Sequence, residues 1–186
     1  MTTASTGKML LVGIDFSQGC ERALLRAVTL AEQCQGQLEL VHVYEWECCG
    51  EPIDARANLP DGVSSAPWSA VNEQARTARA RLGQLCADFV ADRVPAEIRV
   101  LIGDPAAGLL KTAEQVHASC IVLGELGRSA LPRGPVGATA ERVCESSAVP
   151  VRLVPWAKWA QSRQGQHGQG AHEVSRADYP DSARLS

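Results

Sequence analysis

Three glycines in the second half of the chain have the spacing that most suggests ligand chemistry. Two residues separate Gly124 from Gly127, nine separate Gly127 from Gly137, and Ala138 and Thr139 then open a helical pattern. Glycine lets backbone N–H groups approach an anion closely, and a helix N-terminus adds a partial positive charge. The position of these glycines, after a predicted buried strand and before a predicted helix, indicates a phosphate site, whereas the alternative interpretation is that they only make turns. No Gly-Lys-Ser or Gly-Lys-Thr follows them, which excludes a P-loop of the Walker type.

A carboxylate and two guanidinium groups are expected near these glycines. Asp15 ends one apolar segment and Val43 lies near the end of the next. Ligands of open α/β sheets collect at the carboxyl ends of the strands, so Asp15, the backbone near Val43 and the glycine loop should converge. Arg128 and Arg133 lie inside the loop and add positive charge. Asp15 is also the carboxylate that we expect to reach a Mg²⁺ ion bound together with phosphates.

The elements that must position these residues follow from hydrophobic periodicity. Short apolar runs predict strands at 9–15, 38–44, 96–102, 120–123 and 149–154. Amphipathic helices are expected between them, beginning near Ser17, Trp68, Asp104 and Ala138. This alternation predicts an α/β fold, with a five-stranded parallel, doubly wound sheet and helices on both faces. Pro150 favours an edge position for the last strand.

The composition limits the partners of the chain. Its 186 residues include 18 Lys and Arg against 21 Asp and Glu, so the formal net charge is −3. A mildly acidic chain has no general attraction to nucleic acid or to anionic membranes. No apolar run approaches the roughly 20 residues needed to span a bilayer. We therefore expect a cytoplasmic protein that neither binds nucleic acid nor inserts into a membrane.

The chain is expected to divide into an N-terminal extension at 1–7, one domain at 8–154 and a largely disordered tail at 155–186, which is rich in Gln, Ser, Gly and Ala. Inside the domain, residues 45–67 hold three prolines and an excess of acidic residues, which predicts a long loop. Whether this loop is a lid stays open. Its Cys48 and Cys49 belong to seven irregularly spaced cysteines, a pattern that favours reduced thiols over disulfides or a zinc site.

The histidines offer little support for catalysis. A nucleophilic mechanism needs a Ser or Cys beside a base. His42 lies within a predicted strand, where a structural imidazole is more common than a catalytic one, and His117 ends a predicted helix. We assign no catalytic residue, although slow hydrolysis of a bound nucleotide stays open.

At this point the sequence resembles the universal stress protein family, over roughly residues 8–154. The resemblance rests on VGIDFS, LVHVY, GDPAAGLLKTAE and the block LGELGRSALPRGPVGATAERVCESSAVPVRLV. It implies a fold like that of the adenine nucleotide alpha hydrolases. The ATP-binding branch of the family carries G-x2-G-x9-G-(S/T), and Gly124, Gly127 and Gly137 match that spacing. Ala138 departs from the motif, because it has no hydroxyl group.

The resemblance also implies roles for individual residues. Asp15 and the backbone around Gly13 and Val43 would hold the adenosine. The ribose and phosphate side would be lined by Leu123, Gly124 and Gly127, and the phosphates would be bound by Gly137 and Ala138. Arg128 and Thr139 are further candidate nucleotide-binding residues. Because a hydrogen bond to a charged group contributes roughly 1.5–3 kcal/mol, the missing hydroxyl would weaken ATP binding by about tenfold or more. A homodimer through Val149–Val154, an apolar edge strand, is also implied.

Three functions are therefore open. The first is a regulator in the stress response that binds ATP, AMP or ADP, with or without Mg²⁺, and changes its contacts with a protein partner. The second is a nucleotide-free dimeric interaction module of the same fold. The third is a slow Mg²⁺-dependent ATPase switch. The sequence names neither the protein partner nor the stress.

Overall fold

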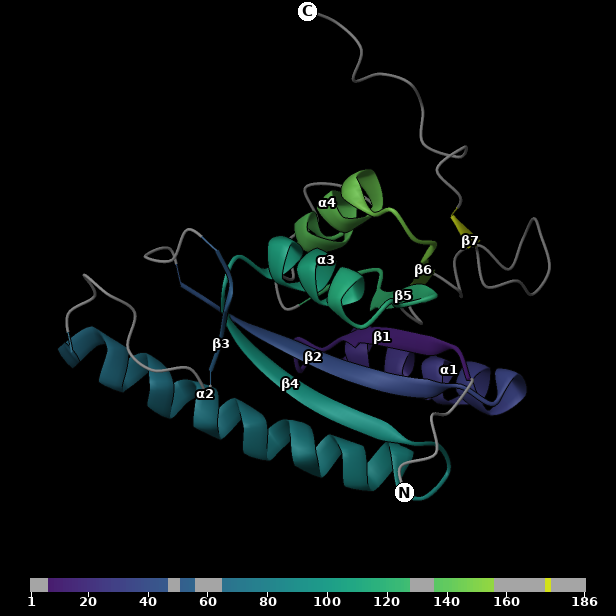
Figure 1. The fold of residues 1–186 in the computed structure, drawn as a ribbon, viewed down its shortest axis with the longest axis horizontal. Coiled ribbons are helices and arrows are strands. Elements are labelled where there is room, and N and C mark those ends of the chain that lie inside the picture. The colour runs from purple at the N-terminus through teal and green to yellow at the C-terminus, as the bar shows by residue number, and fades with distance from the viewer. Residues whose placement is uncertain (1–6, 47–50, 56–64, 128–135, 156–172, 175–186) are drawn as a thin grey trace, which may run out of the picture.

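The computed structural model describes residues 7–46, 51–55, 65–127, 136–155 and 173–174. They form an α/β fold on one sheet with the strand order β3-β4-β2-β1-β5-β6-β7 (Figure 1). The five inner strands are parallel: β4 (Ala96–Gly103), β2 (Gln37–Glu45), β1 (Met9–Gly13), β5 (Cys120–Gly124) and β6 (Val151–Val154). The predicted parallel sheet of five strands is confirmed, and one short antiparallel strand is added at each edge.

Among the described helices, three begin where the sequence predicts them, two of these at polar side-chain caps, whereas the helix expected from Trp68 begins at Ser65. Ser17 caps α1 (Gln18–Cys34), its hydroxyl oxygen accepting from the Cys20 N–H at 3.3 Å. Asp104 caps α3 (Pro105–Gln115) in the same way, at 2.8 Å from the Ala107 nitrogen. The other two are α2 (Ser65–Leu85) and α4 (Ala138–Ser146). After Leu85 the expected continuation of α2 widens into a π-helical turn, η1 (Cys86–Val90).

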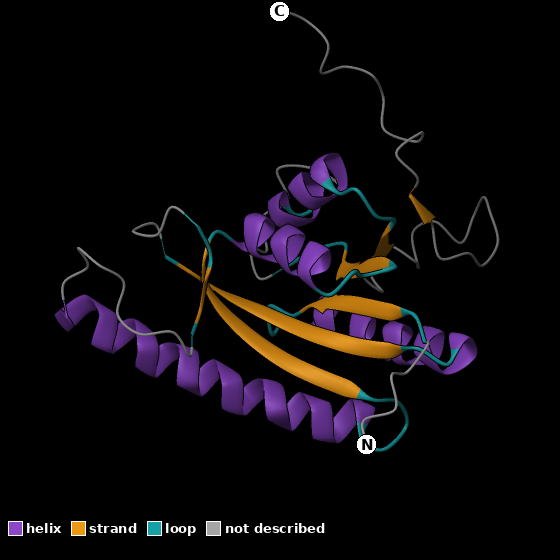
Figure 2. Cartoon of the chain, viewed as in Figure 1, coloured by secondary structure: helices purple, strands orange, loops and turns teal. Residues whose placement is uncertain are grey.

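Helices cover both faces of the sheet, as predicted. Helices α1 and α2 lie on one side, and α3 and α4 lie on the other (Figures 1 and 2). Successive residues of β1 alternate between the two cores, because side chains of a strand point to opposite faces. Val12 packs in the core under α1 and α2, whereas Leu11 packs in the core under α3 and α4. Both side chains are fully buried.

The expected long loop at 45–67 is wrong in part. Strand β2 extends to Glu45, and Ile53–Asp54 form β3, which pairs antiparallel with the outer edge of β4. The Ala55 N–H adds a hydrogen bond of 3.0 Å to the Val100 carbonyl. A strand of two residues has no hydrophobic period, so periodicity could not reveal it. Residues 47–50 and 56–64, which include Cys48 and Cys49, lie outside the described residues.

The last parallel strand differs from its predicted range of 149–154. It begins only at Val151, because the Ser147 hydroxyl donates to the Val149 carbonyl at 2.7 Å and holds a turn just before Pro150. The prediction that this strand is an edge strand is also partly wrong. Strand β7 (Glu173–Val174) pairs antiparallel with Val151 and Arg152 on that edge. Apart from β7 and residue 155, the predicted tail lies outside the described residues.

A buried ion pair joins the two longest strands. The Arg99 side chain on β4 donates to the Glu39 carboxylate on β2 at 2.8 Å, and Glu39 is only 2% exposed. A second nitrogen of Arg99 donates to the Gln115 side chain, in the last turn of α3, at 3.0 Å. Charged groups tolerate such burial when they are paired and hydrogen-bonded. Strands β2 and β4 and helix α3 are thereby tied together.

Candidate functional site

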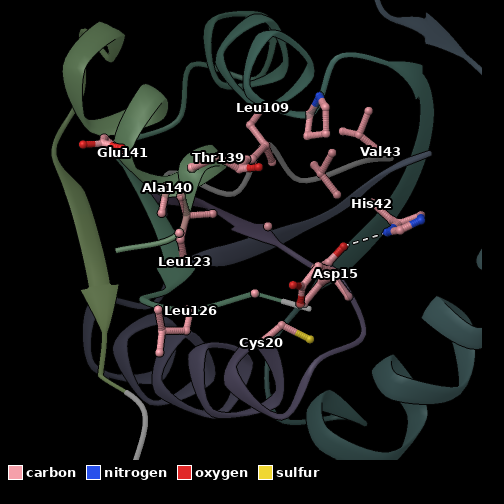
Figure 3. Close-up of a pocket in the computed structure, with 18 of the residues that line it drawn as sticks. Asp15, Cys20, His42, Val43, Leu109, Leu123, Leu126, Thr139, Ala140 and Glu141 are labelled. Carbon is pink, nitrogen blue, oxygen red and sulfur yellow. Dashed lines mark hydrogen bonds between the residues drawn. The ribbon is translucent and has the colours of Figure 1, made fainter. Parts of the chain in front are cut away.

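A cavity of about 490 Å³ opens at the carboxyl ends of β1 and β5 (Figure 3). These strands are neighbours in the sheet. The strands that follow β1 in the chain first lie on one side of it, at β2 and β4, and then on the other side, at β5 and β6, so the strand order reverses at β1. Cavities that hold small ligands typically measure about 300–1,000 Å³, and doubly wound sheets form them at this switch point. The cavity therefore has both the place and the size of a ligand site.

Many of the residues that line this cavity are those expected from the sequence. The described residues that the sequence indicated all line the cavity: Gly13, Asp15, Val43, Leu123, Gly124, Gly127, Gly137, Ala138 and Thr139. Arg128 and Arg133, which were expected to contribute positive charge, lie outside the described residues. The structure thus brings together segments that lie more than a hundred residues apart in the chain.

Asp15 is oriented by the cap of the following helix. Its Oδ1 atom accepts two hydrogen bonds from Ser17, from the backbone nitrogen at 3.0 Å and from the hydroxyl at 2.6 Å. Oδ2 faces Gly127 of the loop after β5, where any side chain would collide with the carboxylate. Gly124 in turn lies directly against the backbone of Gly19 in α1, a close approach that only glycine permits. The two glycines of the motif therefore hold the loop against the beginning of α1.

The residue after Asp15 has a strained backbone. Phe16 has φ of 61°, the left-handed region, which costs a residue with a side chain about 1–2 kcal/mol. Its ring packs on the His42 ring at 4.6 Å between centroids, and the Arg81 guanidinium carbon lies 4.1 Å from its centroid. An aromatic pair and a cation–π contact each contribute on the order of 0.5–1 kcal/mol, enough to offset the strain.

His42 makes a buried hydrogen bond to the backbone before Asp15. The imidazole is buried, and its Nδ1 lies 2.7 Å from the Ile14 carbonyl oxygen (Figure 3). A carbonyl only accepts, so Nδ1 carries the proton and donates it. His42 lines the cavity while its Nδ1 holds the backbone just before Asp15.

The N-terminus of α4 lies at the opposite wall of the cavity. Gly137 is its N-cap and provides no side-chain cap, in contrast to Ser17 and Asp104 at α1 and α3. The Gly137 N–H donates instead to the Glu125 carbonyl at 2.8 Å, which places the first turn of α4 beside the loop after β5. The N–H groups of a first helical turn lack partners within the helix. Ala138, Thr139 and Ala140, all cavity residues, therefore present donors suited to an anion.

An ion pair holds α4 in this position. Arg142 donates two hydrogen bonds to the Asp104 carboxylate, at 2.6 and 3.0 Å, while Asp104 also caps α3. The Arg142 guanidinium is the main cause of a lowered pKa of Asp104. Both side chains are substantially exposed, so the pair contributes mainly geometry. It joins the N-cap of α3 to the second turn of α4, and residues of both helices line the cavity.

Cys20, a buried cysteine of α1, lines the cavity. Burial, followed by the charge of Asp15, raises its pKa to about 11 from 9.0. The Sγ atom lies 3.0 Å from the Ser17 carbonyl oxygen. A thiol with a raised pKa carries little thiolate and reacts slowly. Cys20 is thus a packing residue in the floor of the site.

Sequence reasoning missed several lining residues, among them Glu45, Leu109, Leu126 and Glu141. Glu45 is the last residue of β2, one residue beyond the predicted end of this strand, so its place at the carboxyl end of the sheet could have indicated it. Leu109 and Glu141 reach the cavity from the N-terminal halves of α3 and α4, and their place there depends on how these helices pack. Among the described residues, no group of three or more His, Cys, Asp and Glu side chains is arranged to hold a metal ion.

The sequence and fold match those of a known protein family. The sequence model of the universal stress protein family matches residues 8–155, and the chain belongs to that family. The universal stress protein YxiE of Bacillus subtilis (strain 168) is similar, with 28% identity over 149 residues covering 78% of this chain and 97% of YxiE.

Solved structures agree with this assignment. The universal stress protein UspA from Lactobacillus plantarum is 26% identical, with a TM-score of 0.56, covering 79% of this chain and 97% of its own. A universal stress protein in complex with cAMP has a TM-score of 0.51 at 24% identity, covering 80% and 97%. This second likeness shows a shared fold. Separately, no helix among the described residues is long and apolar enough to cross a membrane.

Proposed function

We propose that this chain is a regulatory protein of the stress response that binds an adenine nucleotide, ATP or else AMP or ADP, in the cavity at the carboxyl ends of β1 and β5. The observation that carries this proposal is the pairing of an uncapped helix N-terminus, at α4, with an oriented carboxylate, Asp15, in one cavity of about 490 Å³. The first suits phosphate and the second suits hydroxyl or amino donors of a nucleoside.

The residues present fit such a ligand. Asp15, with the backbone at Gly13 and Val43, would hold the adenosine. Leu123, Gly124 and Gly127 would line its ribose and phosphate side, and the first turn of α4 would bind the phosphates through Ala138 and Thr139. Arg128 is proposed to add charge from the adjoining loop. One fold relative is known in complex with cAMP, so a protein of this fold accommodates an adenine nucleotide.

A role for Mg²⁺ is the finer part of the proposal. Divalent magnesium keeps most of its water and binds through one or two carboxylates together with phosphates. Asp15 is the proposed contact, although one of its oxygens already accepts two bonds from Ser17. When bound, the ion would neutralise phosphate charge beside the three carboxylates that line the cavity, those of Asp15, Glu45 and Glu141.

Two other functions share the fold. The first is a nucleotide-free dimeric interaction module, in which the glycines only make turns. The second is a slow Mg²⁺-dependent ATPase, for which we assign no catalytic residue. The proposed homodimer through Val149–Val154 requires β7 to leave Val151 and Arg152, because both occupants use the same edge. A protein partner that reads the nucleotide state and a cytoplasmic location are parts of the proposal.

The test is to denature the purified protein and identify any released nucleotide by liquid chromatography and mass spectrometry. ATP, ADP and AMP are then titrated by calorimetry into the emptied, refolded protein, with and without Mg²⁺. Near-stoichiometric adenine nucleotide, or saturable binding of one of the three, would support the proposal. A protein that is empty and binds none of them would favour the nucleotide-free module. Release of phosphate from Mg²⁺-ATP would support the ATPase.

A further inference from the structure

We propose that the side chains of Arg81, Phe16 and His42 form a stack that positions Asp15, so that a residue outside the cavity controls how tightly the site holds its ligand. This inference rests on the proposed function for its ligand. Neither Arg81 nor Phe16 lines the cavity, whereas Asp15 and His42 do.

His42 contacts the backbone or the side chain of both residues that flank Asp15. The Ile14 carbonyl, before it, accepts the His42 Nδ1–H at 2.7 Å. Phe16, after it, packs its ring on the same imidazole at 4.6 Å between centroids. One side chain from β2 therefore holds both neighbours of Asp15, and Figure 3 shows His42 beside Asp15 at this wall of the cavity.

The conformation of Phe16 is the second step. Its φ of 61° turns the chain between β1 and α1 so that Ser17 can donate two hydrogen bonds back to Asp15. An aromatic residue rarely adopts this region, and such strain persists only where the surroundings over-determine it. The ring contacts of Phe16 supply that constraint. Without them, the backbone is free to relax and the Asp15 carboxylate loses its fixed direction.

Arg81 closes the stack from outside. It lies on α2, and its guanidinium carbon is 4.1 Å from the centroid of the Phe16 ring. The residue itself is exposed, so its substitution leaves the core intact. Helix α2 packs against β4 and β2 rather than against the cavity. Arg81 is thus a positioning residue that links the outer surface of α2 to the nucleotide site.

The first experiment measures binding of AMP and ATP by calorimetry to the full chain and to three variants. Arg81→Gln removes the cation, Arg81→Lys retains it, and Arg79→Gln removes a neighbouring charge of the same helix as a matched control. We expect Arg81→Gln to weaken binding by about threefold to fivefold, as for loss of an exposed cation–π contact. Arg81→Lys should restore most of the affinity, and Arg79→Gln should leave it unchanged. Loss of the cation–π contact should lower the melting temperature of Arg81→Gln by about 1–4 °C, so the variant stays folded at 25 °C.

The second experiment needs no ligand. The Ser17 amide donates to Asp15, so its ¹H–¹⁵N signal in the ligand-free protein reports the direction of the carboxylate. Arg81→Gln should move that signal, and Arg79→Gln should not. If the wild type binds no adenine nucleotide but the signal moves, the proposed function fails and the positioning stack stands. If the Ser17 signal is the same in Arg81→Gln and wild type, or if the wild type binds and Arg81→Gln binds equally well, the stack has no positioning role.

Discussion

A Cβ atom placed on Gly127 would lie 2.7 Å from Oδ2 of Asp15, closer than any real contact of that kind. Gly127 belongs to the loop after β5, and Asp15 follows β1, so the absence of a side chain at 127 makes room for a carboxylate more than a hundred residues away. Gly127 therefore shapes the wall of the cavity that holds the Asp15 carboxylate.

Gly127→Ala tests this contact. The backbone of Gly127 is not left-handed, so alanine is allowed there, and the added methyl group should displace the Asp15 carboxylate. We expect nucleotide affinity by calorimetry to fall about tenfold, as for loss of a hydrogen bond from a charged group. Gly83→Ala is the control, since nothing lies within 4 Å of that position in α2; it should stabilise by about 0.5–1 kcal/mol and leave binding unchanged. If both variants bind the nucleotide as tightly as wild type, the Asp15 carboxylate does not contribute to nucleotide binding.

Ala138→Ser tests the phosphate side. The substitution adds a hydroxyl donor at the first residue of α4, where the helix has no side-chain cap. If phosphates lie at this terminus, the affinity for ATP should rise by about tenfold. Thr139→Val is the companion variant, because it removes a hydroxyl of the same wall without changing its shape. An unchanged affinity in Ala138→Ser would argue against phosphate binding by α4.

The Asp104–Arg142 pair predicts a dependence of stability on pH. The pKa of Asp104 is lowered in the folded state, chiefly by its hydrogen bonds with Arg142. The contribution is therefore present above the ordinary value of 3.8 and is lost as pH falls through the lower, folded pKa. Asp104→Asn keeps a capping side chain but removes the charge.

We expect Asp104→Asn to reduce the free energy of unfolding by about 0.2–1 kcal/mol at pH 7, because the pair is exposed and screened by water. The difference from wild type should shrink as the pH falls below 3.8, and it should be lost once the pH is also below the lower pKa of the folded-state carboxyl. Urea unfolding of both proteins between pH 7 and pH 2.5 measures this. Arg142→Gln should follow the same profile, and a difference that persists at the lowest pH would assign the effect to the cap instead.

Cys20 should resist alkylation. Its pKa of about 11 leaves almost no thiolate near neutral pH, so iodoacetamide should modify it far more slowly than an unperturbed thiol. Mass spectrometry of tryptic peptides over a pH series measures the rate. The rate should still be rising at pH 10, and a bound nucleotide should lower it further because Cys20 lines the cavity. Rapid modification at pH 7 would contradict the burial that raises this pKa.

Removal of residues 156–186 should favour self-association. The truncation deletes β7 and leaves the outer edge of β6 unpaired, and such edges pair readily with another strand. Sedimentation equilibrium should show dimers at lower concentration than for the full chain. A chain ending at Ser175 keeps β7 and is the matched control. If both truncations behave like the full chain, β7 does not govern the edge.

Much of the fold was predictable because the inner strands are short apolar runs separated by capped helices. The position of the cavity followed from the same alternation, since strand ends meet where the order reverses. The left-handed conformation of Phe16 was not predictable, because aromatic residues rarely adopt it and nothing local demands it. Glu141 was missed for a similar reason: its place in the site depends on how Arg142 joins α4 to Asp104.

The buried pair of Glu39 and Arg99 has a consequence for how the sheet assembles. Strand β2 is buried on both faces over most of its length, so apolar patterning alone says little about which residue should lie opposite which on β4. A strand displaced along its neighbour would leave the Glu39 carboxylate in the interior without its guanidinium, a far greater loss than any misplaced methyl group. The pair thus favours the observed register of β2 on β4 and destabilises shifted registers that the packing of the surrounding leucines and valines alone would allow.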